Sequence, residues 1–125
     1  MLKYLATNPY ATIRFHASDI ILNIHLDTSY LSYKSAKSRA SGYFFLGSVP
    51  KDGKTIILNV ENFTLCTILK FLVLSAAEAN VGALFMNPKE GHTILLTLAE
   101  IFHPQSQTPV YCHNATVEVI VNGTI

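Results

Sequence analysis

The sequence predicts a single α/β domain whose elements follow in the order β-β-β-α-β-α. Three observations carry this prediction. Apolar and polar residues alternate over 20–27, which is the period of a strand. Aromatic and β-branched residues dominate 41–74, and an Ala-rich segment with helical spacing begins at residue 75. The chain has 125 residues, which is the length of one domain with one core.

Charge in this chain is scarce and balanced. Nine Lys and Arg residues stand against eight Asp and Glu, and charged residues make up 14% of the chain. The near-neutral balance excludes a basic nucleic-acid tail or an acidic disordered segment, and it leaves any nucleic-acid contact to a local patch. Glu61 and Lys70 interrupt the most hydrophobic region, so no uncharged run approaches the roughly 18 residues of a membrane span.

The N-terminal residues lack the apolar stretch of a secretion signal, so we expect an intracellular protein of the cytoplasm or nucleus. Cys66 and Cys112, far apart in the sequence, fit buried free thiols in a reducing compartment better than a disulfide framework.

Three strands are predicted in the first part of the chain. In the first of them Leu22, Ile24 and Leu26 point to one side, and we expect this strand to end near Asp27. An aromatic run follows, with a glycine near its start and a proline at its end. A KDGK turn then leads into a β-branched run, which completes a hairpin. The predicted ranges are 20–27, 41–50 with a turn at 51–54, and an interrupted third strand at 55–60 and 62–74.

A helix is predicted to start at Ser75, with Glu78 three residues later as the partner of a capping box. Asn87-Pro88 and Gly91 are expected to interrupt this helix, because proline removes a backbone donor and glycine weakens a helix interior. The helical pattern resumes at 92–102. A short strand at 109–113 and a second helix at 115–123, cut short by the chain end, complete the order.

Three residues are candidates for a site at the carboxyl ends of the strands, where ligands gather in open α/β sheets. Asp27 closes an apolar strand, Glu78 lies in the first turn of the long helix, and His113 ends the last strand. Each also has a structural interpretation. Asp27 can start an Asx turn, Glu78 can act only in the capping box, and His113 can be an ordinary surface histidine.

Other chemistry is less well supported by the spacing. Cys112 and His113 are adjacent on a strand and point to opposite faces, so they do not form a nucleophile–base pair. A zinc site lacks a second pair of ligands. The other histidines are scattered, and we interpret them as non-functional, although His25 shares a face with Asp27. One basic cluster, interpreted as a solvated loop or a phosphate contact, contains Lys34, Lys37 and Arg39.

Four segments, in this order and at these separations, resemble the ribonuclease H domain of copia-type retrotransposon polyproteins: NIHLDTSY, SRASGYFFLGS, LSAAEANVGAL and PVYCHNAT. The resemblance covers roughly residues 20–123. The preceding KYLATNPYATIRF is similar to the family's connector between polymerase and nuclease. The resemblance therefore implies a connector at 1–18 and a nuclease-like domain at 19–125.

This resemblance implies a ribonuclease-H-like mixed sheet with packed helices, in which the first three strands are antiparallel and the fourth is parallel to the first. It implies an ancestor fused to a reverse transcriptase, which hydrolysed the RNA strand of RNA–DNA hybrids with two Mg²⁺ ions held by carboxylates. Residue by residue, it implies that Asp27 and Glu78 are the metal ligands. The family's third acidic residue falls on His113, and we expect all three side chains to meet at one sheet edge.

His113 is where the pattern breaks, because an imidazole is a poor substitute for a carboxylate on Mg²⁺. The chain also ends before the position of the family's fourth acidic ligand. We therefore expect a C-terminally truncated nuclease domain with weak or no activity and doubtful Mg²⁺ binding. The alternatives are a non-catalytic module that binds nucleic acid through Lys34, Lys37 and Arg39, and a retroelement fragment without a molecular function.

Overall fold

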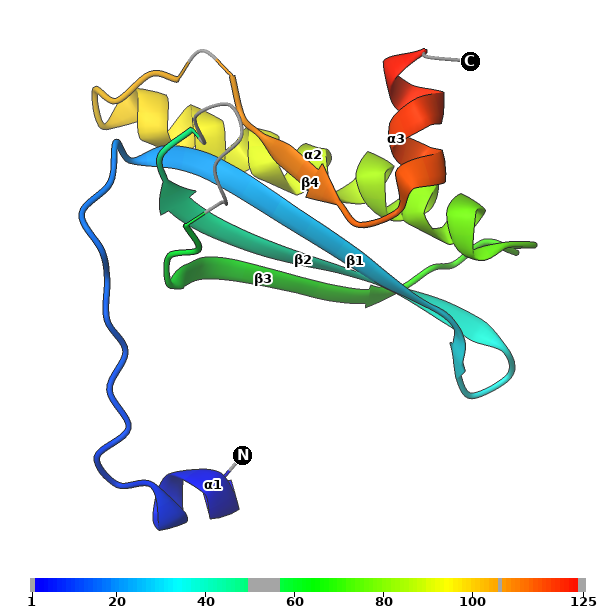
Figure 1. Cartoon of the computed structure of the whole chain (residues 1–125), viewed down its shortest axis with the longest axis horizontal. Coiled ribbons are helices and arrows are strands. Elements are labelled where there is room, and N and C mark those ends of the chain that lie inside the picture. Colours follow the sequence, from blue (N-terminus) through cyan, green and yellow to red (C-terminus); the bar gives the residue numbers. More distant parts are fainter. Residues whose placement is uncertain (1, 50–56, 106, 124–125) are drawn as a thin grey trace.

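The computed structural model describes residues 2–49, 57–105 and 107–123. One four-stranded sheet has the order β3-β2-β1-β4 and a long helix on one face (Figure 1). The elements are α1 (Leu2–Thr7), β1 (Ile21–Tyr33), β2 (Lys37–Gly47), β3 (Glu61–Ile68), α2 (Ala76–Glu100), β4 (Val110–Cys112) and α3 (Ala115–Asn122). From β1 onward the observed order is the predicted β-β-β-α-β-α.

The first three strands pair antiparallel in sequence order. Asp27 lies opposite Ser41 in the β1–β2 pair, and Ser41 lies opposite Cys66 in the β2–β3 pair. The prediction that β1 ends near Asp27 is wrong. β1 continues to Tyr33, because Thr28, Ser29 and Tyr33 still pair with β2, across an irregularity at 30–32, in a long hairpin whose tip extends beyond the helical layer (Figure 1).

Two further boundaries differ from the predicted ones. Lys37 and Arg39 belong to β2 and not to a loop, which leaves Lys34 in the turn between the strands. The third strand covers only Glu61–Ile68, and residues 57–60 are not a strand. The predicted KDGK turn at 51–54 lies outside the described residues.

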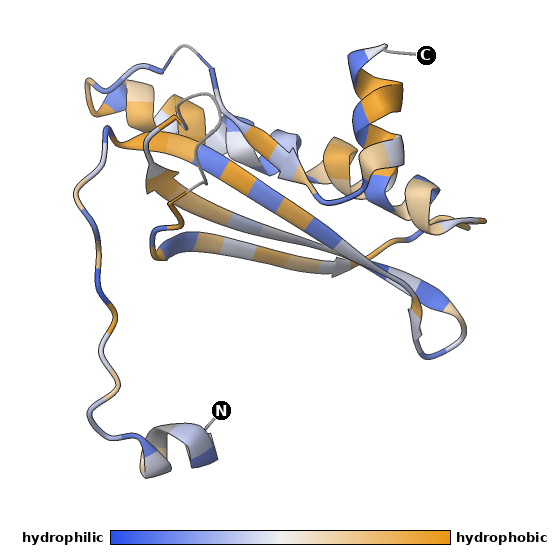
Figure 2. Ribbon diagram, viewed as in Figure 1, coloured by the Kyte–Doolittle hydropathy of each residue, from blue (hydrophilic) through white to orange (hydrophobic). Residues whose placement is uncertain are grey.

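The alternating pattern of β1 separates a buried side from a more polar side (Figure 2). Leu22, Ile24 and Leu26 are fully or almost fully buried, and they belong to two core clusters with residues of α2. Burying one such side chain contributes about 1.5–3 kcal/mol. The opposite face of the sheet, called here the open face, carries the intervening residues Asn23, His25 and Asp27.

β4 is short but decides the topology. It pairs parallel with β1, with His25 opposite Tyr111 and Leu26 opposite Cys112. The Ile24 N–H also donates to the Pro109 carbonyl at 3.0 Å. The predicted parallel neighbourhood of the first and last strands is therefore confirmed, and β1 is hydrogen-bonded on both of its edges.

The predicted interruption of the long helix is wrong, since α2 runs without a break through Pro88 and Gly91. The reason is tertiary packing. A Cβ at Gly91 would lie 2.6 Å from the Ile24 Cδ1 atom, so glycine at this position lets the helix approach β1 closely. Contacts along β1 and β2 offset the roughly 3 kcal/mol that proline costs in a helix interior.

Asn87 and Gly42 form a close contact between α2 and the sheet. Asn87 is fully buried, and its Nδ2 donates to the Ala83 carbonyl at 2.9 Å and to the Ser41 carbonyl at 3.3 Å. A Cβ at Gly42 would lie 1.8 Å from the Asn87 Oδ1 atom. Only glycine at residue 42 therefore leaves room for this side-chain bridge between α2 and β2.

The segment before β1 extends away from the sheet (Figure 1). α1 and residues 8–20 expose large apolar side chains, among them Tyr10 and Ile13. His16 anchors this segment, because its backbone exchanges two hydrogen bonds with the Asn59 side chain. Across the ranges that the structure describes, no helix combines the length and hydropathy needed to cross a membrane.

We expect Gly42→Ala to lower the free energy of unfolding by about 1–3 kcal/mol, because the new methyl group overlaps the Asn87 amide. In Gly42→Ala combined with Asn87→Ala, the total loss should be smaller than the sum of the two single losses. Urea denaturation followed by far-UV circular dichroism measures this, since the chain has no tryptophan. Gly47→Ala, whose new Cβ meets nothing closer than 3.0 Å, is the milder control. Additive losses would contradict the proposed contact.

Candidate functional site

The candidate site on the open face is built by the pairing of β1 with β4. His25 and Asp27 share this face of β1, and Tyr111 shares it on β4 because it lies opposite His25. His113 follows β4 at the bend before α3, and its ring packs edge-on against His25 with centroids 4.7 Å apart. Two residues from distant parts of the chain therefore meet as a histidine pair.

Burial and charge both act on His25. Desolvation lowers the pKa of His25, the nearby His113 lowers it further, and Asp27 raises it. The net direction is downward from the ordinary value. The ring centroid of Tyr111 lies 6.3 Å from that of His25, and the Tyr111 hydroxyl donates to the Asn23 Oδ1 atom at 3.2 Å. The folded protein therefore favours a neutral His25.

Asp27 is exposed and only partly committed to local structure. Its Oδ1 accepts the Thr28 N–H at 2.8 Å, and its backbone carbonyl accepts the Ser41 hydroxyl at 3.0 Å. The Asx turn considered from the sequence does not form at this place, because β1 continues through residues 28 and 29. The second carboxylate oxygen has no hydrogen-bond partner among the described residues and faces solvent.

Glu78 forms one half of the predicted capping box, and its side chain binds the N–H of the residue before the N-cap in place of the N-cap N–H. Its N–H donates to the Ser75 Oγ at 3.1 Å, and its Oε2 accepts the Leu74 N–H at 2.7 Å. Glu78 lies in the first turn of α2, the helix that covers the face opposite to Asp27 and His25. The expected meeting of Asp27, Glu78 and His113 remains a prediction, since the described contacts link only Asp27 and His113, through His25.

The donor set on the open face does not fit Mg²⁺. Magnesium prefers carboxylate and water oxygens in octahedral geometry, whereas this face offers the single carboxylate of Asp27 and the imidazoles of His25 and His113. The Glu78 carboxylate already accepts the Leu74 N–H at the start of α2. In residues 2–49, 57–105 and 107–123, no three His, Cys, Asp or Glu side chains are grouped closely enough to hold a metal ion.

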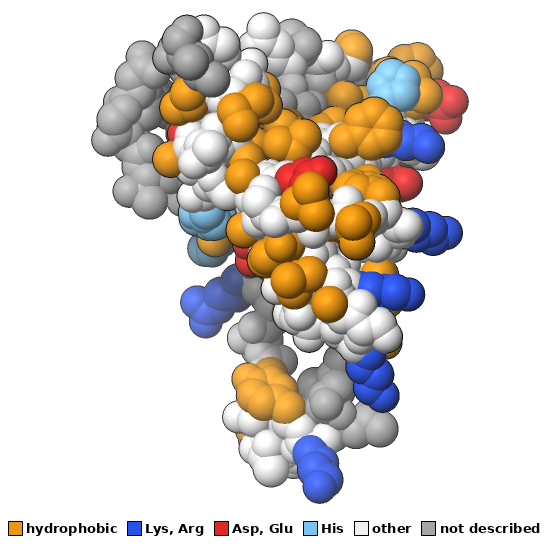
Figure 3. Space-filling model, turned by 90° about the vertical axis from the view of Figure 1, so that its right-hand side faces the viewer, with side chains coloured by type: hydrophobic (Ala, Val, Ile, Leu, Met, Phe, Trp, Pro, Cys, Tyr) orange, Lys and Arg blue, Asp and Glu red, His pale blue; other side chains and the backbone are white. Residues whose placement is uncertain are grey.

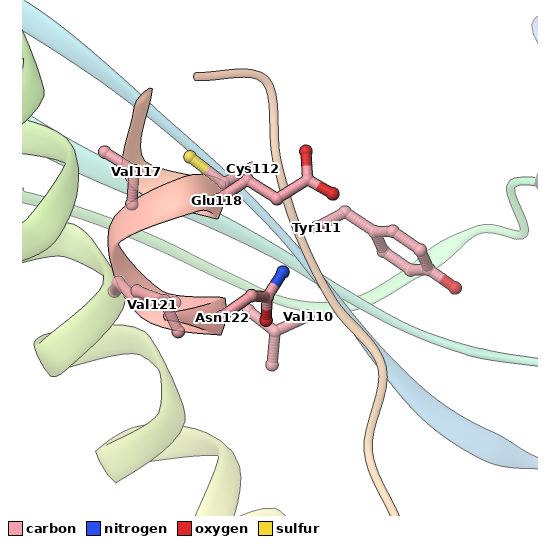
Figure 4. Close-up of a pocket in the computed structure, with 8 residues that line it drawn as sticks. Val110, Tyr111, Cys112, Val117, Glu118, Val121 and Asn122 are labelled. Atoms are coloured by element: carbon pink, nitrogen blue, oxygen red, sulfur yellow. The ribbon is translucent and has the colours of Figure 1, made fainter. Parts of the chain in front are cut away.

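A cleft of about 310 Å³ lies on the other side of β4, against α2 and α3. Its apolar wall includes Leu84 and Val117, and Glu118 stands at the rim. Val117 and Val121 lie on the side of α3 that faces α2, while Tyr111 points to the opposite side (Figure 4). The Cys112 thiol donates to the Asn80 Oδ1 at 3.6 Å, so β4, α2 and α3 are connected here. The Asn114 side chain caps α3 by accepting the Thr116 and Val117 N–H groups.

The basic residues of the hairpin are split between two environments. The Arg39 guanidinium lies over the Tyr33 ring at 4.9 Å, in the range of a cation–π contact. Lys37 and Lys70 line a cleft of about 420 Å³ with the half-exposed Phe71. Figure 3 shows that most Lys and Arg side chains in that view lie along one side of the molecule, beside a surface where hydrophobic side chains gather.

His25 is the residue that sequence reasoning missed. The alternation of β1 already placed it on the face of Asp27, but nothing in the sequence shows that residue 113 lies against residue 25. Lys70 was missed in the same way, because it joins Lys37 only when the segment after β3 folds back beside the hairpin.

Comparisons with protein-family models, curated proteins and solved structures found no match to this chain.

We expect acid to destabilise the protein through His25. Because the pKa of His25 is lowered in the folded protein, the unfolded state binds more protons than the folded state when the pH falls below about 6.5, the ordinary pKa of histidine. The contribution of His25 to stability is fully present above that value and is lost as pH falls through the lower, folded pKa. Urea midpoints measured between pH 8 and pH 5 should decline less in His25→Gln than in the native chain. The difference should correspond to the pH-dependent stability that the lowered pKa of His25 contributes.

The exposed His92, on α2, provides the matched control, since His92→Gln should keep the native decline. A direct reading comes from the NMR titration of the His25 ring, whose pKa should rise in His113→Gln because one positive neighbour is removed. An unchanged His25 pKa in that variant would show that the two rings do not interact.

Proposed function

We propose that this chain is a ribonuclease-H-like domain of copia-type retroelement descent, which has kept the sheet of a hybrid nuclease and lost most of its hydrolytic activity. The observation that carries the proposal is the parallel pairing of β4 with β1 beside an antiparallel β1–β2–β3 meander. That arrangement is the one implied by the four sequence segments. It also brings Asp27 and His113, two of the three implied positions, to one face of the sheet.

The expected weakness of catalysis rests on the local charge. Two-metal hydrolysis needs a concentration of negative charge, and the ancestral acid at residue 113 is replaced by an imidazole. A protonated His113 beside His25 would repel a divalent cation. We propose that Mg²⁺ binds this surface weakly, and that the RNA–DNA hybrid, if bound, is not cut efficiently.

Restoring the acid tests this proposal. His113→Asp should raise the affinity for Mg²⁺ or Mn²⁺ by about tenfold, the effect of one good electrostatic contact of about 1.4 kcal/mol, because a carboxylate replaces a group that can carry positive charge. Isothermal calorimetry measures the metal affinity, and a hybrid-cleavage assay with Mn²⁺ follows the reaction. Cleavage should stay slow even where binding recovers.

The matched control is His92→Asp, which adds a carboxylate at another exposed histidine and should leave the metal affinity near that of the native chain. Equal metal affinity in native protein and folded His113→Asp would show that residue 113 is not a ligand position. Efficient hybrid cleavage by the native chain, retained in His113→Ala, would refute the loss of activity.

A second candidate function is nucleic-acid binding without hydrolysis, and one observation favours it. Lys37, Lys70 and the half-exposed Phe71 line one cleft, which combines positive charge with an aromatic surface. Charged grooves with aromatic side chains bind single strands through phosphate contacts and base stacking. Arg39 adds a cation on the open face, two residues from Ser41, which lies opposite Asp27.

For this second function we expect a fluorescently labelled RNA–DNA hybrid or single strand to bind at low salt and to dissociate as salt is raised. Lys37→Ala with Lys70→Ala should reduce the affinity and lower the slope of log K against log salt by about one to two units. Lys3→Ala, on the separate helix α1, should change little. If no binding occurs at low salt, the remaining alternative is a retroelement fragment without a molecular function.

A further inference from the structure

β3 is an unprotected edge of the sheet. It pairs only with β2, and among the described residues no backbone hydrogen bond reaches its other side. Exposed edge strands are normally protected by lysine, proline or a strong bulge. Between Glu61 and Ile68 there is neither lysine nor proline, and the bulge lies only at the start, near Phe63. Among the residues that the structure describes, none occupies most of this edge, which can therefore accept another strand.

The surface beside this edge combines apolar side chains with one positive and one negative charge, so two copies of it can complement each other. A cleft of about 360 Å³ separates Leu65 and Thr67 of β3 from the middle of α2. Phe85 of α2 lines this cleft and is 78% exposed. Lys89 and Glu90, adjacent and exposed on α2, complete the lining with one positive and one negative charge.

We propose that the occupant of this edge is a second copy of the chain, joined by antiparallel pairing of the two β3 strands. A two-fold axis perpendicular to the sheet makes the free edge complementary to itself and keeps both α2 helices on the same face. Pairing symmetric about Leu65 places Thr64 opposite Cys66 of the second copy. Side chains at paired positions of the two β3 strands then lie on the same face of the extended sheet, as strand geometry requires.

Charge complementarity identifies the second copy as the partner. Because the cleft lies beside Leu65, the same axis brings the two clefts together and sets the middle of one α2 antiparallel to that of the other. Lys89 of each copy then approaches Glu90 of the other, and both Phe85 rings are covered. An unrelated strand would satisfy the backbone of β3 but would not supply this reciprocal pair of charges. This inference does not depend on the proposed nuclease ancestry.

The oligomeric state in solution tests the proposal. Light scattering during size-exclusion chromatography, repeated over a range of concentrations, should show a dimer that dissociates on dilution. Thr64→Lys should weaken the dimer by about tenfold or more, because it places a charge on each of two adjoining edges. Thr116→Lys, an equally exposed threonine on α3 beyond the opposite edge of the sheet, is the matched control.

Charge reversal on α2 gives a second test that leaves the strand unchanged. Lys89→Glu and Glu90→Lys should each weaken the dimer, and the double exchange should restore it, because reversing both charges recreates the reciprocal pairs. A short bismaleimide should link two copies through the exposed Cys66 in Cys112→Ser, and not through Cys112 in Cys66→Ser. A monomer at all accessible concentrations, a dimer insensitive to Thr64→Lys, or linkage only through Cys112 would each overturn the proposal.

Discussion

The central position of β1 is the constraint on which the rest of the structure depends. One side of β1 is buried under α2, and both of its edges are hydrogen-bonded, one to β2 and the other to β4. A shift of one residue in its register would move Leu22, Ile24 and Leu26 out of the core and bring His25 and Asp27 into it. The burial of three apolar side chains therefore also fixes which polar side chains reach the open face.

Close approach of α2 to the sheet explains why residues that normally break helices occur inside it. Gly91 lies against Ile24, and the Asn87 side chain lies over Gly42. Larger residues at the two glycine positions would separate the helix from the sheet. The Asn87 Oδ1 atom has no hydrogen-bond partner among the described residues, so this contact combines tight packing with an electrostatic cost.

The features predictable from the sequence were those with a local or periodic cause. The alternation around Ile24 predicts the buried face of the strand, and Ser75 predicts the start of the helix, because a strand face and an N-cap are each encoded within a few residues. The continuation of β1 to Tyr33 was not predictable, since residues 31–33 are exposed, Leu31 has a positive φ of 49°, and only the pairing of Tyr33 with Lys37 holds this end of the strand to β2. The continuity of α2 was not predictable either, because the local preference of Pro88 is overridden by contacts with distant strands.

The candidate site divides in the same way. Asp27 and His113 were identified from short segments, whereas the contact between His113 and His25 depends on the pairing of β4 with β1.

The pairing of β4 with β1 has a kinetic consequence. Asn23 and Tyr111 are 88 residues apart along the chain, so β4 closes a far longer loop than the β1–β2 hairpin does. With only three residues of strand to offset this entropy, β4 is expected to dock late in folding and to open first in the native state. The histidine pair thus forms at the least persistent junction of the sheet, where amide hydrogens should exchange soonest.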